Sequence, residues 1–156
     1  NIPAFAVNGI ANNKITNNKM YDYTKKDYDY GTNKEMVLLS VLQDNIDKDL
    51  QPTTNKYSVV DFTSSNSNVE LKTRRCYYNT YEDTMIGYNK IQKLLTDKKD
   101  GYAVFNFLDG VYYIEIVQSN VVKFRLDDGG RCDRGRVEKN KYYYIPINIL
   151  KSIQKK

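Results

Sequence analysis

The alternation of apolar and polar residues predicts one helix near the start of the chain. In residues 31–46, GTNKEMVLLSVLQDNI, apolar side chains recur every three or four positions, which is typical of one face of a helix. Thr32 followed by Glu35 is a capping-box pattern, in which each side chain bonds a backbone amide of the first turn. Pro52 and its polar neighbours interrupt the chain after this segment, so we expect the helix to end before them.

Runs rich in β-branched and aromatic residues then predict strands, with a second helix among them. Residues 56–62 and 69–74 flank a turn rich in Ser and Asn, and we expect them to pair as a hairpin. Residues 81–95 carry apolar side chains at helical spacing, which predicts the second helix. Two further strands are predicted at residues 102–108 and 111–117, joined by a turn at Asp109-Gly110, and another strand is predicted at residues 121–126. A loop rich in Gly and Arg follows at residues 127–136. Residues 141–153 predict a last strand that turns at Pro146 into a short helix.

The order of these elements predicts the fold class. Residues 1–30 are rich in Asn, Lys and Tyr and show no steady periodicity, so we expect an irregular N-terminal arm. Residues 31–156 contain no repeat and no linker. A helix, a hairpin, a second helix and further strands in this order indicate one α/β domain with a central mixed β-sheet flanked by helices.

The composition excludes several classes of enzyme. The 156 residues include no histidine, and Ser-His-Asp hydrolases, Cys-His proteases and HExxH metalloproteases all need an imidazole. Catalysis by this chain must therefore use carboxylates, Lys, Tyr or a bound metal ion. The chain carries 24 Lys and Arg against 19 Asp and Glu, a net charge of +5. This positive charge favours anionic partners such as nucleic acid, but a similar charge is also common in domains that bind no anionic partner.

The cysteines and the apolar runs indicate the compartment. Cys76 and Cys132 are isolated, so neither a disulfide framework nor a CxxC zinc knuckle can form, and a reducing, intracellular compartment fits best. No run approaches the ~20 apolar residues of a membrane span, which predicts no membrane partner. Heavy use of Asn, Lys, Tyr and Ile indicates AT-rich codons, as in a phage, a large DNA virus or an AT-rich bacterium.

The predicted hairpin brings two carboxylates and an ammonium within reach of one point. Side chains two residues apart on a strand project to the same face, so Glu70 and Lys72 point the same way. Asp61 lies near the turn-side end of the partner strand and can approach Glu70 across the hairpin. Two neighbouring carboxylates repel unless a cation lies between them, and Mg²⁺ or Mn²⁺ prefers such oxygen ligands. The ion can acidify a water and offset charge on a phosphate, while Lys72 orients or deprotonates that water or stabilises the transition state.

Asp61, eight intervening residues and then Glu70-Leu71-Lys72 resemble the motif of the PD-(D/E)xK nuclease superfamily, which includes restriction enzymes and Holliday-junction resolvases. The resemblance implies a restriction-endonuclease-like core and Mg²⁺ or Mn²⁺ as cofactor. It implies that Asp61, Glu70 and the main-chain carbonyl of Leu71 bind the metal and that Lys72 acts on the water. Glu35, in the preceding helix, stands in the place of an additional catalytic glutamate of that superfamily.

Two features depart from the superfamily pattern. Val60 stands where the motif usually has Pro. The interval between the first helix and Asp61 has room for one strand, whereas the superfamily core has two, and a missing strand would leave Glu35 too far from the hairpin. The resemblance covers residues 31–95, with a looser echo in the YYYIP segment near the end of the chain.

Basic residues around the motif are candidate contacts to DNA. They follow the triplet, lie in the second helix or belong to the Gly- and Arg-rich loop: Arg74, Arg75, Lys90, Arg131, Arg134 and Arg136. Arg74 and Arg75 point to opposite faces of a continuing strand, so at most one of them needs to touch substrate. Resolvase-like relatives often carry a polar residue at the place of Lys90. The glycines of the loop would let main-chain amides approach phosphates.

Each candidate also has a purely structural explanation. The spacing of the motif arises by chance in a chain this rich in charge, and Glu35 completes a capping box. Lys72 can pair with a neighbouring carboxylate as a surface salt bridge. Tyr77 and Tyr78 could stack on unpaired bases, but among 15 tyrosines core packing is the more common role.

The sequence therefore supports hypotheses from different classes. The first is a metal-dependent nuclease, a hydrolase of DNA phosphodiester bonds, whose substrates could be branched or single-stranded. A homodimer is then among the expected partners, because resolvases and many restriction enzymes cut two strands as dimers. The second is a non-catalytic nucleic-acid-binding or protein-interaction module of the same fold, and the third is a structural or virion-associated protein.

Overall fold

The structure of this chain, a computed structural model, describes residues 36–54, 58–131 and 138–153. The chain divides into two units, residues 1–40 and 41–156, and every described strand belongs to the second unit. The expected irregular arm of residues 1–30 lies outside the described residues.

The first predicted helix is confirmed where the chain is described. It covers residues 36–45, and Leu42 on its apolar face is fully buried. The helix ends in a turn in which the amides of Ile46 and Asp47 both donate hydrogen bonds to the carbonyl of Leu42. Thr32 and Glu35, the predicted cap, lie outside the described residues.

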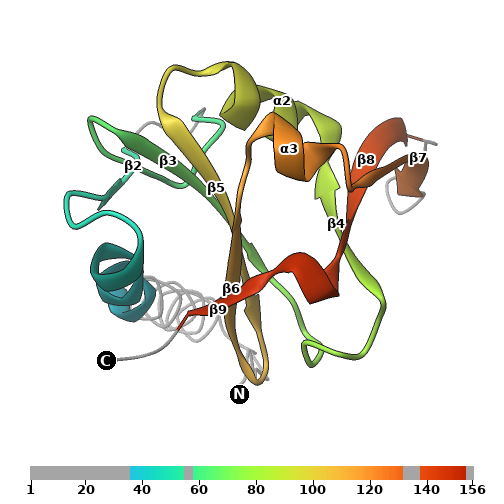
Figure 1. Ribbon diagram of the computed structural model, residues 1–156, viewed down its shortest axis with the longest axis horizontal. Coiled ribbons are helices and arrows are strands. Elements are labelled where there is room, and N and C mark those ends of the chain that lie inside the picture. Colours follow the sequence, from blue (N-terminus) through green and yellow to red (C-terminus); the bar gives the residue numbers. More distant parts are fainter. Residues whose placement is uncertain (1–35, 55–57, 132–137, 154–156) are drawn as a thin grey trace, which may run out of the picture. The chain divides into compact units, whose positions relative to one another are not determined.

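Most of the described strands form one mixed sheet (Figure 1). Among the described residues this sheet has six strands, in the order β1-β2-β3-β5-β6-β9. Their bounds are Gln51–Pro52 (β1), Phe62–Thr63 (β2), Ser67–Thr73 (β3), Asp100–Phe107 (β5), Gly110–Glu115 (β6) and Lys151–Ile153 (β9). Strands β3 and β5 are parallel and the other pairs are antiparallel. Parallel neighbours need a crossover, and helix α2, Tyr88–Thr96, lies within it.

Between the first helix and Asp61 the described residues hold one strand, β1, as expected, and β2 begins directly after Asp61. Strand β1 is only two residues long and contains Pro52, which is tolerated at the edge of a sheet. The amide of Thr53 donates to the carbonyl of Asp61 at 3.0 Å and continues the pairing beyond the strand. Among the described residues of the strand predicted at 56–62, only Phe62 belongs to a strand, because the chain bends at residues 59–61 before β2 begins.

A second sheet of three described strands has the order β4-β8-β7, with bounds Asp83–Gly87 (β4), Glu138–Pro146 (β8) and Arg125–Arg131 (β7). Strand β4 corrects the helix predicted at residues 81–95, which is helical only from Tyr88 onward. Thr84 and Ile86 are buried and Met85 between them is exposed, which is the period of two expected of a strand. Gly87 then serves as the N-cap of α2.

The C-terminal predictions are partly confirmed. The β5–β6 hairpin is present, and β8 turns at Pro146 into the short 3₁₀ helix Ile147–Ile149. The strand predicted at residues 121–126 forms only at its end, because helix α3, Gln118–Val121, occupies its start and β7 begins at Arg125. The side-chain amide of Asn120 donates to the carbonyl of Glu115 at 2.8 Å and holds this turn in place. Strand β7 runs into the predicted Gly- and Arg-rich loop, and β9 was not predicted.

Helix α2 packs against both sheets, where it contacts β3, β4, β5 and β8 (Figure 1). Its residues Ile91 and Leu94 are buried in the main apolar cluster, and each such side chain contributes about 2 kcal/mol. Gly101 of β5 permits close approach, since a Cβ there would lie 2.8 Å from the carbonyl oxygen of Leu94. This packing places Lys90 of α2 beside β3.

The predicted fold class, α/β with a mixed central sheet, is confirmed. Within the described part of the chain, no helix is long and apolar enough to cross a membrane.

Candidate active site

Side-chain hydrogen bonds fix the turn of the β2–β3 hairpin. The hydroxyl of Ser64 accepts hydrogen bonds from the amides of Asn66 and Ser67, at 3.1 and 2.9 Å. Such local bonds favour a turn over a continued strand. The resulting register pairs Phe62 with Val69, and it places the residue before Phe62 opposite the residue after Val69.

Asp61 and Leu71 meet at one edge of β3. The Oδ2 atom of Asp61 accepts a hydrogen bond from the amide of Leu71 at 2.8 Å, and the amide of Asp61 donates to the carbonyl of Val69 at 2.9 Å. The N–H and C=O groups of one strand residue face the same edge, so the carbonyl of Leu71 also faces Asp61. Two oxygen donors of the predicted metal site therefore lie on one side of β3.

Glu70 lies between two lysines. Its side chain is buried, and Oε2 is 3.1 Å from Nζ of Lys72 while Oε1 is 3.4 Å from Nζ of Lys90. The ammonium of Lys90 also donates a hydrogen bond to the carbonyl of Val59, at 2.7 Å. Oε1 of Glu70 has no hydrogen-bond partner among the described residues. The ammonium of Lys90 compensates the charge of this oxygen, and a ligand outside the chain could supply the hydrogen bond or metal bond that it lacks.

The electrostatic environment opposes ionisation of Glu70. Burial raises the pKa of this carboxyl above its ordinary value of 4.5, and the negative charge of Asp61 raises it further. Lys72 and Lys90 act in the opposite direction but do not cancel the loss of hydration. The formal charges of Asp61 and Glu70 are balanced by those of Lys72 and Lys90, so it is mainly the lost hydration of Glu70 that a water or a cation at its buried oxygen would restore.

The donor set fits a hard divalent cation that keeps several waters. Asp61 and Glu70 supply carboxylates and Leu71 supplies a carbonyl, the oxygen donors that Mg²⁺ and Mn²⁺ prefer. No group of three or more His, Cys, Asp and Glu side chains surrounds one point within the described residues. Glu35, the predicted third carboxylate, lies outside them.

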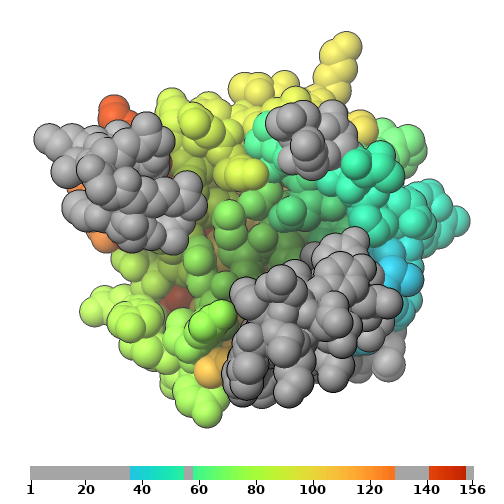
Figure 2. Space-filling model, turned by 180° about the vertical axis from the view of Figure 1, so that it is seen from behind, coloured from blue at the N-terminus to red at the C-terminus, as the bar shows by residue number. Residues whose placement is uncertain are grey.

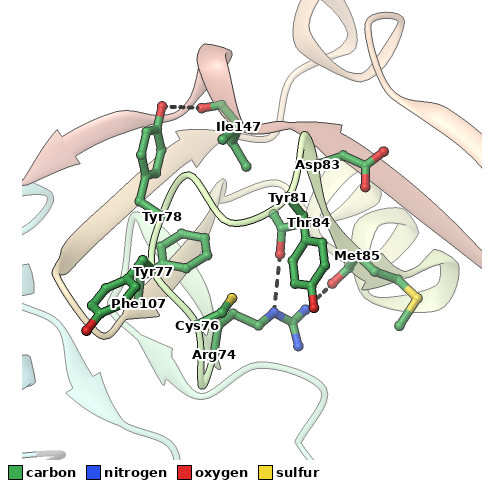
Figure 3. A pocket seen from close by; sticks show the side chains of 10 residues that line it. All are labelled: Arg74, Cys76, Tyr77, Tyr78, Tyr81, Asp83, Thr84, Met85, Phe107 and Ile147. Carbon is green, nitrogen blue, oxygen red and sulfur yellow. Dashed lines mark hydrogen bonds between the residues drawn. The ribbon is translucent and has the colours of Figure 1, made fainter.

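Arg74 is held within the protein. Its Nε donates to the hydroxyl of Thr84 at 3.2 Å and its Nη2 donates to the carbonyl of Met85 (Figure 3). Its guanidinium carbon lies 5.8 Å from the ring centre of Phe105, and burial lowers the pKa of the group. Arg74 therefore joins β3 to β4, and only the remainder of its guanidinium could meet a phosphate.

The other basic candidates are dispersed. Lys90 is part of the site, and Arg75 is exposed on the segment that follows β3. Arg131 ends β7, and its side chain lies outside the described part of the chain, as do Arg134 and Arg136. Their contact with DNA stays a prediction.

A scan against models of protein families and a search of curated proteins found no match to this sequence. The resemblance to PD-(D/E)xK nucleases therefore rests on the motif itself.

Several residues near the site were not recognised from the sequence. Thr84 and Tyr81 were assigned to a helix, although the alternation of residues 83–87 was the available signal for a strand. The carbonyl of Val59, which anchors Lys90, has no sequence signal, because every residue carries a carbonyl. Tyr78 packs in the core, as its common role predicts: its ring stacks on Tyr112 with 4.0 Å between ring centres.

Proposed function

We propose that this protein is a metal-dependent nuclease that hydrolyses phosphodiester bonds in DNA. One observation carries the proposal: the buried oxygen of Glu70 has no hydrogen-bond partner among the described residues and belongs to a site with the carboxylate of Asp61. The ammonium of Lys72 lies 3.1 Å from the same carboxyl group. This arrangement suits the binding of a cation and of an anionic substrate beside it.

The residues of the site have separate roles in this proposal. Asp61, Glu70 and the carbonyl of Leu71 hold Mg²⁺ or Mn²⁺, which when bound acidifies a water and offsets charge on the phosphate. Lys72 is about one-third exposed, so its ammonium can donate hydrogen bonds both to Glu70 and to a water or phosphate oxygen. Lys72 thereby orients the attacking group against the phosphorus atom.

Lys90 is a positioning residue rather than a catalytic one. It bonds the carbonyl of Val59, two residues before Asp61, and forms an ion pair with Glu70. It therefore ties the carboxylate of Glu70 to the chain two residues before Asp61. Its substitution should change metal affinity more than it changes the chemical step.

A non-catalytic nucleic-acid-binding or protein-interaction module of the same fold is the second candidate. It is favoured by the finding that Lys72 and Glu70 already form an ion pair, and by the lack of a third acidic side chain at the site among the described residues. Such a module would bind DNA in a salt-sensitive way that ignores metal and survives loss of Asp61 and Glu70.

The deciding experiment is cleavage of plasmid, single-stranded and branched DNA with Mg²⁺, with Mn²⁺ and with EDTA. We expect metal-dependent cleavage by the natural chain and at least a hundredfold slower cleavage by Lys72→Ala. Lys93→Ala is the matched control, because Lys93 lies on the same helix as Lys90 but pairs with Asp97 at 3.7 Å. Equal rates for Lys72→Ala and the natural chain would remove the proposal.

The remaining parts of the proposal concern location and assembly. We propose an intracellular location, or a virion or infected host cell if a virus encodes the chain, because the cysteines fit a reducing compartment. Cutting of both strands would require two sites, and a homodimer would provide them.

A further inference from the structure

A cavity of about 320 Å³ lies at the end of β3. Its walls come from the segment between β3 and β4, which begins at Arg74, from β4 and β5, and from the 3₁₀ helix (Figure 3). The residues that matter here are Arg74, Cys76, Tyr81, Thr84, Phe107 and Ile147. In Figure 2 the green and yellow-green surface of this part of the chain surrounds a hollow, with red C-terminal surface at its bottom.

Contacts on two sides hold the rim of the cavity in place. The hydroxyl of Tyr78 donates to the carbonyl of Ile147 at 2.7 Å, and the amide of Ile147 donates to the carbonyl of Glu82 at 3.0 Å. The amide of Tyr78 donates to the carboxylate of Asp109 at 2.9 Å. The loop that forms the rim is therefore tied to the β5–β6 turn and to the 3₁₀ helix. A ligand would meet a preformed cavity and would lose little affinity to ordering it.

The cavity gathers exposed apolar side chains. Tyr77, Tyr81 and Met85 are exposed, and all three line this one cavity. Tyr81 is 66% exposed, and its ring points toward the guanidinium of Arg74, whereas the ring of Tyr77 points away (Figure 3). Exposed aromatic rings at the mouth of a cavity are typical of a binding site. Tyr81 and Arg74 both line the cavity, and the hydroxyl end of Tyr81 points toward the guanidinium, so a flat aromatic ligand stacked on this ring would have a cation in the same cavity (Figure 3).

The cavity adjoins the candidate active site along one strand. Glu70, Lys72 and Arg74 alternate along β3 and its continuation, so they project to the same face. Arg74 lies roughly 7 Å beyond Lys72 along the strand. If one phosphate of an extended DNA strand lies at Lys72, the next nucleotide lies at the level of Arg74. Arg74 and Tyr81 line the same cavity, so the base of that nucleotide would reach Tyr81.

We propose that this cavity binds an unpaired nucleobase, stacked on Tyr81 beside Arg74, next to the phosphodiester that is cut. This inference rests on the proposed nuclease function and names its substrate class, a strand with unpaired bases at the cleavage point. A base in continuous duplex is stacked on its neighbours and cannot enter. Base stacking on aromatic side chains is tolerant of sequence, so no base preference is expected.

The test is binding of a single-stranded oligodeoxynucleotide that carries 2-aminopurine, whose fluorescence changes when the base stacks on a ring. The full chain is used in EDTA, so that nothing is cleaved. We expect Tyr81→Ala to weaken binding of the oligonucleotide roughly tenfold and to remove the fluorescence change. Tyr81→Phe, which keeps the ring, should retain the affinity and the fluorescence change of the natural chain. Val122→Ala is the matched control, because Val122 is 68% exposed and lies outside the cavity.

Two further arms define the ligand. Tyr81→Ala should bind a blunt duplex of the same sequence as well as the natural chain does. The matching oligoribonucleotide shows whether the unpaired base must come from DNA or can come from RNA. Each variant is checked for an unchanged thermal transition, which is expected because the ring of Tyr81 is exposed.

Three results would overturn the inference. The first is no binding of the single strand by the natural chain, and the second is a loss in Tyr81→Ala that is equal for single strand and duplex. The third is a concentration-dependent dimer that Tyr81→Ala abolishes, which would assign the cavity to a second copy of the chain. The binding assay contains no metal, so its outcome does not depend on cleavage. If the base stacks on Tyr81 in this assay but the protein cleaves no DNA when metal is added, only the nuclease proposal is removed.

Discussion

Lys90 of α2 and Glu70 of β3 form an ion pair, with 3.4 Å between Nζ and Oε1. The same ammonium donates a hydrogen bond to the carbonyl of Val59 at 2.7 Å. One lysine thus connects the buried carboxylate with the chain two residues before Asp61. The mutual position of the two acidic residues therefore depends on a helix outside the hairpin that carries them.

Replacement of Lys90 by Ala should move the acid limb of the cleavage rate to higher pH. Lys90 lowers the pKa of Glu70, so its removal raises that pKa, and the ionised carboxylate then needs a higher pH to form. The measurement is the rate of plasmid cleavage against pH at one fixed Mn²⁺ concentration below saturation. Lys93→Ala should keep the profile of the natural chain, and an unshifted limb in Lys90→Ala would contradict the assigned role.

Replacement of Glu70 by Gln should stabilise the metal-free protein relative to the natural chain as the pH rises. The folded-state pKa of Glu70 is raised above 4.5, mainly by burial, so the favourable contribution of the protonated group is complete below about pH 4. It is lost as the pH rises through the raised pKa, whereas Gln cannot ionise. The difference in Tm between variant and natural chain should therefore grow from pH 4 to pH 8 in EDTA.

Asp97→Asn provides a control of opposite sign for that measurement. The hydrogen bond from Asn68 lowers the pKa of Asp97 below its ordinary value of 3.8. The ionised group therefore stabilises the fold above that value, and this stability is lost as the pH falls through the lowered pKa. Relative to the natural chain, Asp97→Asn should lose Tm only as the pH rises to about 4, and from pH 4 to pH 8 its difference in Tm should stay constant. Parallel slopes for the two variants would show that Glu70 is not the group responsible.

Mn²⁺ should raise the Tm of the natural chain but not that of Asp61→Asn or Glu70→Gln. At a free concentration one hundred times the Kd, a ligand of the folded state stabilises it by about 2.7 kcal/mol. The effect should increase with pH, because the metal binds the ionised carboxylates. Differential scanning calorimetry with matched EDTA samples measures it. Asp49→Asn, at an exposed carboxylate of the turn before β1, should respond as the natural chain does, and an equal response of Glu70→Gln would place the metal elsewhere.

The local geometry of the hairpin could be read from the sequence, whereas its surroundings could not. Glu70 and Lys72 project to one face because alternation is a property of every strand. The position of Asp61 follows from a register that the Ser64 turn fixes with bonds between near neighbours. The contact between Lys90 and Val59 has no such signal, since it depends on how α2 docks on the sheet.

Strand β4 shows how distant pairing overrides a local pattern. Met85, Tyr88 and Ile91 fit a helical period, so the sequence favoured a helix through all of residues 81–95. In the structure Met85 pairs with Tyr144 of β8, about sixty residues later in the chain, and this pairing holds residues 83–87 extended. The tie between Arg74 and Thr84, and the cavity beside it, follow from β4 and could not be predicted without it.

Replacement of Gly101 by Ala should destabilise the fold and weaken metal binding together. The added Cβ would lie 2.8 Å from the carbonyl oxygen and 2.9 Å from the Cβ of Leu94, so α2 would have to move away from β5. Overpacking of this kind costs about 1–3 kcal/mol, which urea denaturation can measure.

Gly87→Ala is the matched control for that substitution. Its Cβ would meet only the Cγ of Lys90, at an ordinary 3.8 Å, so its cost should stay below about 1 kcal/mol, that of a less favourable N-cap. Because α2 carries Lys90, Gly101→Ala should also reduce the Mn²⁺-induced rise in Tm, whereas Gly87→Ala should preserve it. A destabilised Gly101→Ala variant with an undiminished Mn²⁺ response would show that the acidic site is set by the β2–β3 hairpin alone and that the position of α2 does not contribute to it.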